Sequence, residues 1–343
     1  MQDPIQLIEA LCSGHGIPGR EANVAEVARK MFEPYCDKTW VDKFGNAYGV
    51  IGETGPKVFM CAHSDEVGMM ATEVDDGGFI RFERVGGVDP RVLPGSEVLV
   101  HGRETLFGVI GATPPHLQEP DAQKKLFPVE KLRVDIGYPV EKARQLVRPG
   151  DMITFLAPVV RLDGGHVAAK SQDDRAGIVA MVLCMEELSR MKLNCQAVFC
   201  ATISEEIGLK GGTMAGWATN PDAAIVLEVT HGPCPGSGDW ETTALNKLSF
   251  GTGPNIHPRL LQRIRQAATE MGIDHELRVF PGGTPTDASA IQVMRKGIPC
   301  ALLELPLKYM HTTVETLNVE TLRKAGKVMT RYLSGITAEG GAV

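Results

Sequence analysis

The sequence lacks several features that would assign it to a large class of proteins. None of its eight cysteines forms a C-x-x-C pair, so zinc ligation by cysteine is disfavoured and buried free thiols are expected. Lys and Arg number 35 against 42 Asp and Glu, the net charge is -7, and no block of like charge occurs, which argues against a nucleic-acid partner.

Long apolar runs are also missing. The longest, around Gly177 to Met185, is far shorter than the roughly 18 residues needed to span a bilayer, and the first residues lack a secretion signal. A cytoplasmic protein without membrane contact is therefore expected. No internal repeat or low-complexity tract is visible.

The amino-acid composition is typical of a globular protein. The 343 residues are 43% hydrophobic and 22% charged, enough for two or three domains with a sizeable core. Apolar residues at helical spacing predict two helices between Asp3 and Met31. Further helices are expected over Ala176 to Met191, Pro258 to Met271 and Val319 to Leu333.

Short apolar runs predict strands around these helices. The expected strands are Tyr48 to Ile51, Val58 to Ala62, Ala197 to Ile203, Ala223 to Val229 and Ala301 to Leu305. Between about Gly68 and Asp163, by contrast, Gly and Pro every several residues separate short β-like pieces, which are Phe79 to Phe82, Glu97 to Val100, Leu106 to Ile110 and Met152 to Phe155.

This alternation predicts an α/β fold. We expect a twisted mixed sheet flanked by helices, formed by residues 1–67 and 164–343, and interrupted by a small β-rich domain over residues 68–163. Both flanks of the insert are needed to build one sheet.

Potential metal ligands follow or end three of the expected strands. His63 follows one strand, Glu205 and Glu206 follow another, and Glu228 lies near the end of a third. Ligands of open α/β sheets bind at the carboxyl ends of strands, so these side chains are expected to converge. Two further candidates lie in loops. Asp173 precedes a helix, and His311 follows the last strand.

Two histidines with three carboxylates and no thiol suit Zn²⁺, Co²⁺ or Mn²⁺. The set is large enough for two metal ions that share a bridging Asp. Each element also has a plain alternative, since Asp173 is a good helix cap, Glu205 and Glu206 could begin a solvated helix, and His311 could be a surface histidine. Only their joint placement favours the metal site.

Four motifs carry a family resemblance, and they occur in the family's order. His63-Ser64-Asp65-Glu66-Val67-Gly68, Asp173-Asp174-Arg175-Ala176-Gly177, Glu205-Glu206-Ile207-Gly208 and Tyr309-Met310-His311 resemble those of the glutamyl/leucyl aminopeptidases, cytoplasmic metallopeptidases that form tetrahedral dodecamers. The similarity extends to Gly16-Ile17-Pro18-Gly19-Arg20-Glu21 and Thr286-Asp287-Ala288, so it spans nearly the whole chain.

The resemblance implies a zinc-peptidase-like catalytic domain with a PDZ-like or barrel insert. It implies that Asp173 bridges two divalent ions, with His63 and Glu228 at one and Glu206 and His311 at the other. Asp65 would orient His63. Glu205 would be general base and acid for a hydroxide held between the two metals, which attacks the first peptide bond of a substrate with a free N-terminus.

Three positions depart from the family pattern. Glu228 replaces the usual Asp ligand, Lys308 replaces Arg, and Ser204 replaces Gln. The loops at 232–243 and 281–287 are expected to select the N-terminal residue of the substrate. The remaining histidines are expected to be structural or solvated, with two alternatives left open: His231 could face the site, and His116 in the insert could serve an assembly interface. A homo-oligomer, from dimer to dodecamer, is expected through the insert.

Several alternative functions are compatible with parts of the same sequence pattern. A deacylase or carboxypeptidase on the same dimetal scaffold would recognise different substrate ends. A glycosidase using Glu205 and Glu206 is disfavoured, because its carboxylates must flank the bond from opposed sides. A catalytically dead relative that binds peptides is the alternative outside the enzymes.

Overall fold

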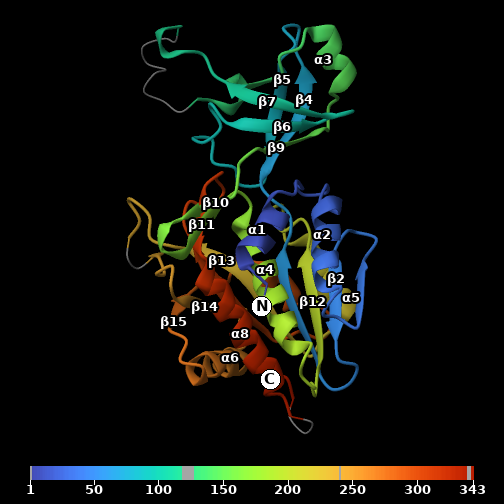
Figure 1. Cartoon of the computed structure of the whole chain (residues 1–343), viewed down its shortest axis with the longest axis vertical. Coiled ribbons are helices and arrows are strands. Elements are labelled where there is room, and N and C mark those ends of the chain that lie inside the picture. Colours follow the sequence, from blue (N-terminus) through green and yellow to red (C-terminus); the bar gives the residue numbers. More distant parts are fainter. Residues whose placement is uncertain (1, 118–126, 239–240, 338–340) are drawn as a thin grey trace.

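The fold is seen in a computed structural model, which describes residues 2–117, 127–238, 241–337 and 341–343 (Figure 1). A broad α/β layer structure lies below a smaller β-rich part in that view. No helix among the described residues is long and apolar enough to cross a membrane. All eight cysteines are free, six of them buried, as their spacing predicts.

An eight-stranded mixed sheet forms the centre of the larger part. Its order is β1-β2-β12-β3-β13-β16-β14-β15. The four central strands β12, β3, β13 and β16 run parallel, so their carboxyl ends meet at one edge. The strands are β1 Lys38–Val41, β2 Ala47–Ile51, β3 Lys57–His63, β12 Gln196–Thr202, β13 Ala223–His231, β14 Leu248–Thr252, β15 His275–Val279 and β16 Cys300–Leu307.

Helices flank this sheet and bury its apolar residues. α4 packs against β3, β13 and the C-terminal α8, while α5 and α7 pack together and contact β12, β13 and β16. The helices of this part are α1 Pro4–Cys12, α2 Ala22–Phe32, α4 Gln172–Leu188, α5 Lys210–Thr219, α6 Pro258–Glu270, α7 Asp287–Ile291 and α8 Val319–Ser334. The α/β fold with a twisted mixed sheet is thereby confirmed.

The β-rich part is a closed barrel with its own hydrophobic core. The strand order is β4-β5-β8-β7-β6-β9, and α3 (Val140–Leu146) packs beside β4. The barrel strands are β4 Gly68–Val74, β5 Ile80–Val85, β6 Glu97–His101, β7 Thr105–Gly111, β8 Arg133–Asp135 and β9 Met152–Phe155. A closed barrel has no exposed sheet edge, which suits a small inserted unit.

A three-stranded sheet adjoins the barrel. β10 (Val160–Leu162), β11 (His166–Ala169) and β17 (Glu315–Asn318) pair antiparallel in this order. β17 directly precedes α8, whereas β11 leads into α4, so this small sheet ties the start of α4 to the C-terminal segment.

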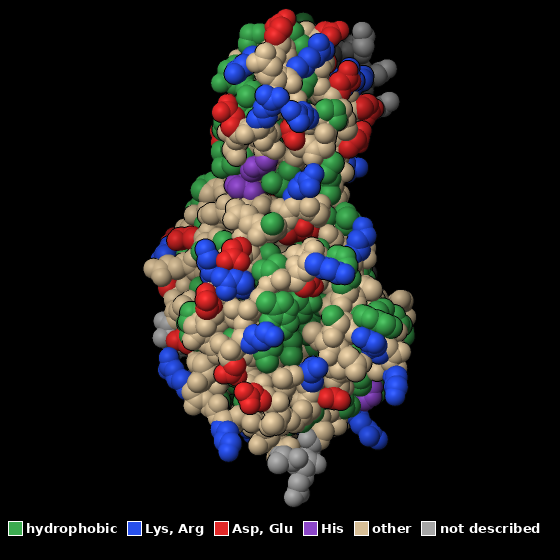
Figure 2. Space-filling view, turned by 90° about the vertical axis from the view of Figure 1, so that its right-hand side faces the viewer, with side chains coloured by type: hydrophobic (Ala, Val, Ile, Leu, Met, Phe, Trp, Pro, Cys, Tyr) green, Lys and Arg blue, Asp and Glu red, His purple; other side chains and the backbone are tan. Residues whose placement is uncertain are grey.

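Histidine side chains gather at the narrow waist between the two parts (Figure 2). The Thr154 hydroxyl in β9 lies 2.8 Å from His15 Nδ1 and 2.9 Å from His101 Nε2. Burial, with Lys170 nearby, lowers the pKa of His15 to about 4, so this ring is neutral at pH 7. One hydroxyl thus joins the N-terminal loop to two barrel strands.

The differences from the sequence prediction have local causes. α4 begins at Gln172 rather than Ala176, but Asp173 and Asp174 lack helical dihedral angles, so the regular helix begins after them. The apolar pattern does not predict α5, because Gly211, Gly212 and Gly216 interrupt it. β14 and β15 were missed because they are short and Leu248 to Thr252 mixes small and polar residues.

Candidate active site

The predicted site residues meet at the carboxyl edge of the parallel strands. His63 ends β3, Glu206 lies in the turn after β12, and Glu228 lies in β13. Asp173 belongs to the first turn of α4, and His311 follows β16. These positions match the general rule for ligand sites of open α/β sheets.

The Asp173 carboxylate lies between the two histidines. Its Oδ1 is 3.0 Å from His63 Nε2, and its Oδ2 is 3.2 Å from His311 Nε2. The two oxygens therefore face different rings, which is the arrangement that a bridging carboxylate requires.

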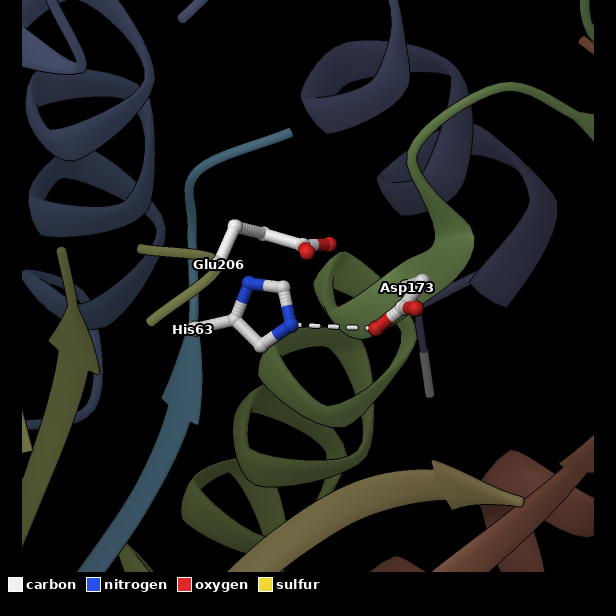
Figure 3. Close-up of side chains that lie close together, drawn as sticks. All are labelled: His63, Asp173 and Glu206. Atoms are coloured by element: carbon white, nitrogen blue, oxygen red, sulfur yellow. Dashed lines mark hydrogen bonds and ion pairs between the residues drawn. The ribbon is translucent and has the colours of Figure 1, made fainter. Parts of the chain in front are cut away.

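The two glutamates lie at opposite ends of this array. Glu206 Oε1 is 3.2 Å from His311 Nε2, and Glu228 Oε1 is 3.7 Å from His63 Nε2. Figure 3 shows the side chains of His63, Asp173 and Glu206 directed toward one another from three separate elements. One ligand atom from each of these three lies within 4.8 Å of the others, a spacing that a metal ion fits.

The hydrogen bonds of the two rings indicate which nitrogen is available as a ligand. His63 Nδ1 is 3.2 Å from the Asp65 carbonyl oxygen, and His311 Nδ1 is 3.0 Å from that of Gly87. A carbonyl accepts only, so each Nδ1 carries the hydrogen, and in a neutral ring Nε2 keeps its lone pair. Two lone pairs then face the Asp173 carboxylate, a contact that needs a proton or a cation between the atoms.

The pKa values reflect the same excess of negative charge. Burial lowers the pKa of His311, but Asp173 and Glu206 outweigh it and raise this pKa to about 11. Burial and the neighbouring Asp174 raise the pKa of Glu228 well above its usual range. A divalent cation would relieve both effects, so the donor set fits a metal.

Glu205 occupies a different position from its neighbour. Its carboxylate makes no hydrogen bond with the described residues, and it lines the cavity over the site. Burial and the nearby carboxylates raise the pKa of Glu205 to about 8, and they outweigh His63, which lowers it. A carboxylate of this kind can take up a proton near neutral pH.

Two buried carboxylates hold the turn that carries Glu205 and Glu206. Asp65 Oδ1 accepts from the Glu205 backbone N–H at 3.1 Å, and Asp65 Oδ2 accepts from that of Glu206 at 3.2 Å. Glu21 Oε1 accepts from the Ser204 N–H at 3.1 Å and from its hydroxyl at 2.9 Å. Ser204 has a positive φ of 53°, so these bonds stabilise a strained backbone.

Glu315 connects two of the candidate ligands, Asp173 and His311. Its Oε2 accepts from the Asp173 backbone N–H at 3.1 Å, and its Oε1 accepts from that of His311 at 2.8 Å. Glu315 and Gly87 carry no local sequence signal, because one is an isolated Glu and the other is a Gly outside the motifs. Glu21, by contrast, ends the Gly16-Ile17-Pro18-Gly19-Arg20-Glu21 motif, and this position is the sequence signal for its role.

A cavity of about 290 Å³ extends from these residues. His231, Pro285 and Thr286 line it, and so do Arg278 of β15 and Glu304 of β16, neither of which the sequence analysis singled out. Among the described residues of the two loops expected to select substrate, those that line the cavity belong to 281–287. Residues 239–240 of the other loop lie outside the described residues.

Comparisons with known proteins agree on one family. The model of the M42 glutamyl aminopeptidases matches residues 45–328. Lysyl aminopeptidase from Pyrococcus furiosus is 29% identical over 316 residues, which are 90% of this chain and 91% of that protein.

Solved structures extend the match to the whole fold. The TET aminopeptidase from Thaumarchaeota archaeon SCGC AB-539-E09 superimposes with a TM-score of 0.92 at 28% identity, covering 98% of this chain and 97% of the other. The Pyrococcus horikoshii TET1 peptidase, which can assemble into a tetrahedron or a large octahedral shell, gives 0.87 at 31% identity and covers 97% and 100%. The chain therefore belongs to the M42 glutamyl aminopeptidase family and is a metal-dependent aminopeptidase.

Proposed function

We propose that this aminopeptidase binds two divalent ions per subunit, zinc or cobalt, with manganese as the alternative. His63 and Glu228 would hold one ion, Glu206 and His311 the other, and Asp173 would bridge them. The observation that carries this proposal is the Asp173 carboxylate, whose two oxygens face the Nε2 atoms of two different histidines. Asp65 would act as a positioning residue, since it contacts His63 and the turn at 205–206.

Bound divalent ions lower the pKa of a water molecule from about 15.7 towards neutrality and polarise a carbonyl group. Glu205 accepts the proton of the attacking water and delivers it to the leaving amine. Its half-buried carboxylate, free of hydrogen bonds to the described residues, supports this role. Glu206 is unavailable for it because its carboxylate lies against His311.

The substrates are peptides with a free N-terminus, because the α-amine is the group that distinguishes an aminopeptidase from a deacylase. We also infer that residues 68–163 form an inserted domain and that the protein is a homo-oligomer, from dimer to dodecamer. The assembly of the Pyrococcus horikoshii TET1 peptidase supports the second inference.

The test is hydrolysis of aminoacyl-p-nitroanilides by metal-stripped protein, with and without added Co²⁺, Zn²⁺ or Mn²⁺. The same substrates carrying an N-acetyl group serve as the matched control. We expect metal-dependent cleavage of the free forms only, with two metal equivalents bound at full activity. Equal release of p-nitroaniline from the acetylated substrates would show that a free α-amine is not required, and release of acetate from them would instead identify a deacylase.

A further inference from the structure

His231 and Glu205 stand on opposite sides of His63. His231 ends β13 and Glu205 follows β12, and β3, which ends at His63, lies between these two strands. Neighbouring strands are spaced by about 4.8 Å, so β12 and β13 are roughly 10 Å apart. Both residues line the cavity over the site. A carbonyl group held in this cavity would have Glu205 on one side and His231 on the other.

The His231 ring has no partner within the part of the chain that the structure describes. Neither ring nitrogen takes part in a hydrogen bond or an ion pair there, and the side chain is exposed at the cavity. The rings of His63 and His311, by contrast, both contact the Asp173 carboxylate. The nitrogens of His231 are therefore available to a bound ligand.

The same ring is neutral at pH 7. Burial and the nearby Arg278 lower the pKa of His231, and they outweigh Asp173 and Glu241, which raise it. A neutral imidazole carries one N–H donor. It can stabilise negative charge without repelling a divalent cation nearby, as a protonated ring would.

The remaining side-chain donors of the cavity lining are engaged or remote. The Thr230 hydroxyl receives a hydrogen bond from Arg278 and donates one to Glu304. Arg278 itself belongs to β15, at the far edge of the sheet. The Thr286 side chain is 5% exposed, and its hydroxyl already lies 3.1 Å from another hydroxyl. Among the described lining residues, His231 is thus the free donor beside the candidate ligands.

We propose that the His231 N–H stabilises the negative charge that develops on the carbonyl oxygen of the first peptide bond during hydrolysis. This inference rests on the proposed function, in which Glu205 takes the proton of the attacking water on the opposite side. The water oxygen bonds to the carbonyl carbon, and the π pair of the C=O bond moves onto the carbonyl oxygen. When the C=O bond re-forms, the C–N bond breaks and the amine leaves with the proton from Glu205. His231 acts on the charged oxygen between these two steps.

The first measurement compares kcat and KM of metal-loaded variants for the best-cleaved aminoacyl-p-nitroanilide. We expect His231→Ala and His231→Phe to lower kcat by about 10- to 100-fold, the range for a hydrogen bond to a charged group. KM should change little, because the bond forms only in the transition state. His231→Gln keeps an amide N–H and should retain part of the rate.

The second measurement is binding, which does not depend on turnover. An aminoboronic acid with the side chain of the best-cleaved substrate binds as a tetrahedral anion, whereas the matching amino alcohol supplies the amine without that charge. Calorimetry should show that His231→Phe weakens binding of the boronic acid by about the factor lost in kcat/KM. Binding of the amino alcohol should not change.

The control variant is His166→Phe in β11. His166 is also partly exposed, but it lies outside the cavity lining, so its kcat and both affinities should equal those of the wild type. Metal content and thermal unfolding are measured for every variant. If His231→Phe fails to fold, His231→Ala carries both measurements.

Three results would overturn the proposal and leave the aminopeptidase standing. A rise in KM at unchanged kcat would assign His231 to binding of the ground state. Equal weakening of the boronic acid and the amino alcohol would show that the ring does not respond to the anionic oxygen. Loss of metal from the His231 variants would assign the ring to the metal site. Failure of the wild type to cleave any free substrate with metal restored would instead overturn the proposed function.

Discussion

Glu205 and Glu206 are neighbours in the chain with different surroundings, and a pair of variants can separate their roles. We expect Glu205→Gln to keep both metal ions and to lower kcat by about 10²–10⁴-fold, the usual contribution of general acid–base catalysis. Glu206→Gln should lose one metal equivalent together with activity, because Glu206 lies 3.2 Å from His311 Nε2. Metal content measured beside turnover checks this, and equal metal loss in both variants would contradict it.

Glu21 is predicted to act through the backbone of Ser204. Glu21→Ala removes the acceptor of the Ser204 N–H and hydroxyl, so the turn relaxes, and both kcat and metal affinity should fall by about tenfold. Glu21→Gln retains an oxygen at the same place and should restore most of both. Titration of metal-stripped protein with Zn²⁺ gives the affinity. If the Gln variant were as impaired as Ala, the charge of Glu21 rather than its acceptor would be important.

Among the larger elements, the segment after β5 links the barrel to a proposed metal ligand, since the Gly87 carbonyl oxygen lies 3.0 Å from His311 Nδ1. A Cβ at Gly87 would lie 2.7 Å from His311 Nδ1, so Gly87→Ala must displace the ring. We expect a 10- to 100-fold loss of metal affinity, typical of a disturbed partner of a ligating histidine.

The matched control is Gly111→Ala in β7, where the nearest atom, the Arg133 carbonyl oxygen, lies 4.0 Å from the added Cβ. It should keep the metal affinity and the unfolding temperature of the wild type. Unchanged affinity in Gly87→Ala would mean that the barrel segment does not position His311.

For the molecule as a whole, a buried ion cluster predicts how stability depends on pH. Glu66 pairs with Lys170 at 2.5 Å and with Arg175 at 3.2 Å, and these residues also bond carbonyls of the 11–14 segment. Burial raises the pKa of Glu66, but the two cations outweigh it and lower this pKa to about 2. The cluster therefore joins the N-terminal segment, β3 and α4.

Because the folded pKa of Glu66 lies below the unfolded value near 4.5, its stabilisation is complete above pH 4.5 and is lost as the pH falls towards 2. The shift corresponds to roughly 3 kcal/mol. Urea unfolding of the wild type and Glu66→Gln should differ by this amount at pH 6 and converge near pH 2. A constant difference would contradict the prediction.

Much of the site was predictable because its residues sit at strand ends. The runs before His63 and Glu205 and around Glu228 are apolar enough to be recognised as buried strands, and parallel strands bring such ends together. Four barrel strands were also predictable, since the runs at Phe79 to Phe82, Glu97 to Val100, Leu106 to Ile110 and Met152 to Phe155 coincide with β5, β6, β7 and β9. The pairing that closes them into a barrel was not, because it joins segments far apart in the chain.

Local patterns in the chain determined the alternation of helices and strands, the ligand types and their order, because hydrophobic periodicity and residue chemistry act over a few neighbours. Contacts between distant segments could be seen only in the folded chain. Gly87 reaches His311 across 224 positions, Glu21 reaches Ser204 across 183, and Arg278 reaches Thr230 across 48. Each depends on the packing of whole elements, which no stretch of neighbouring residues encodes.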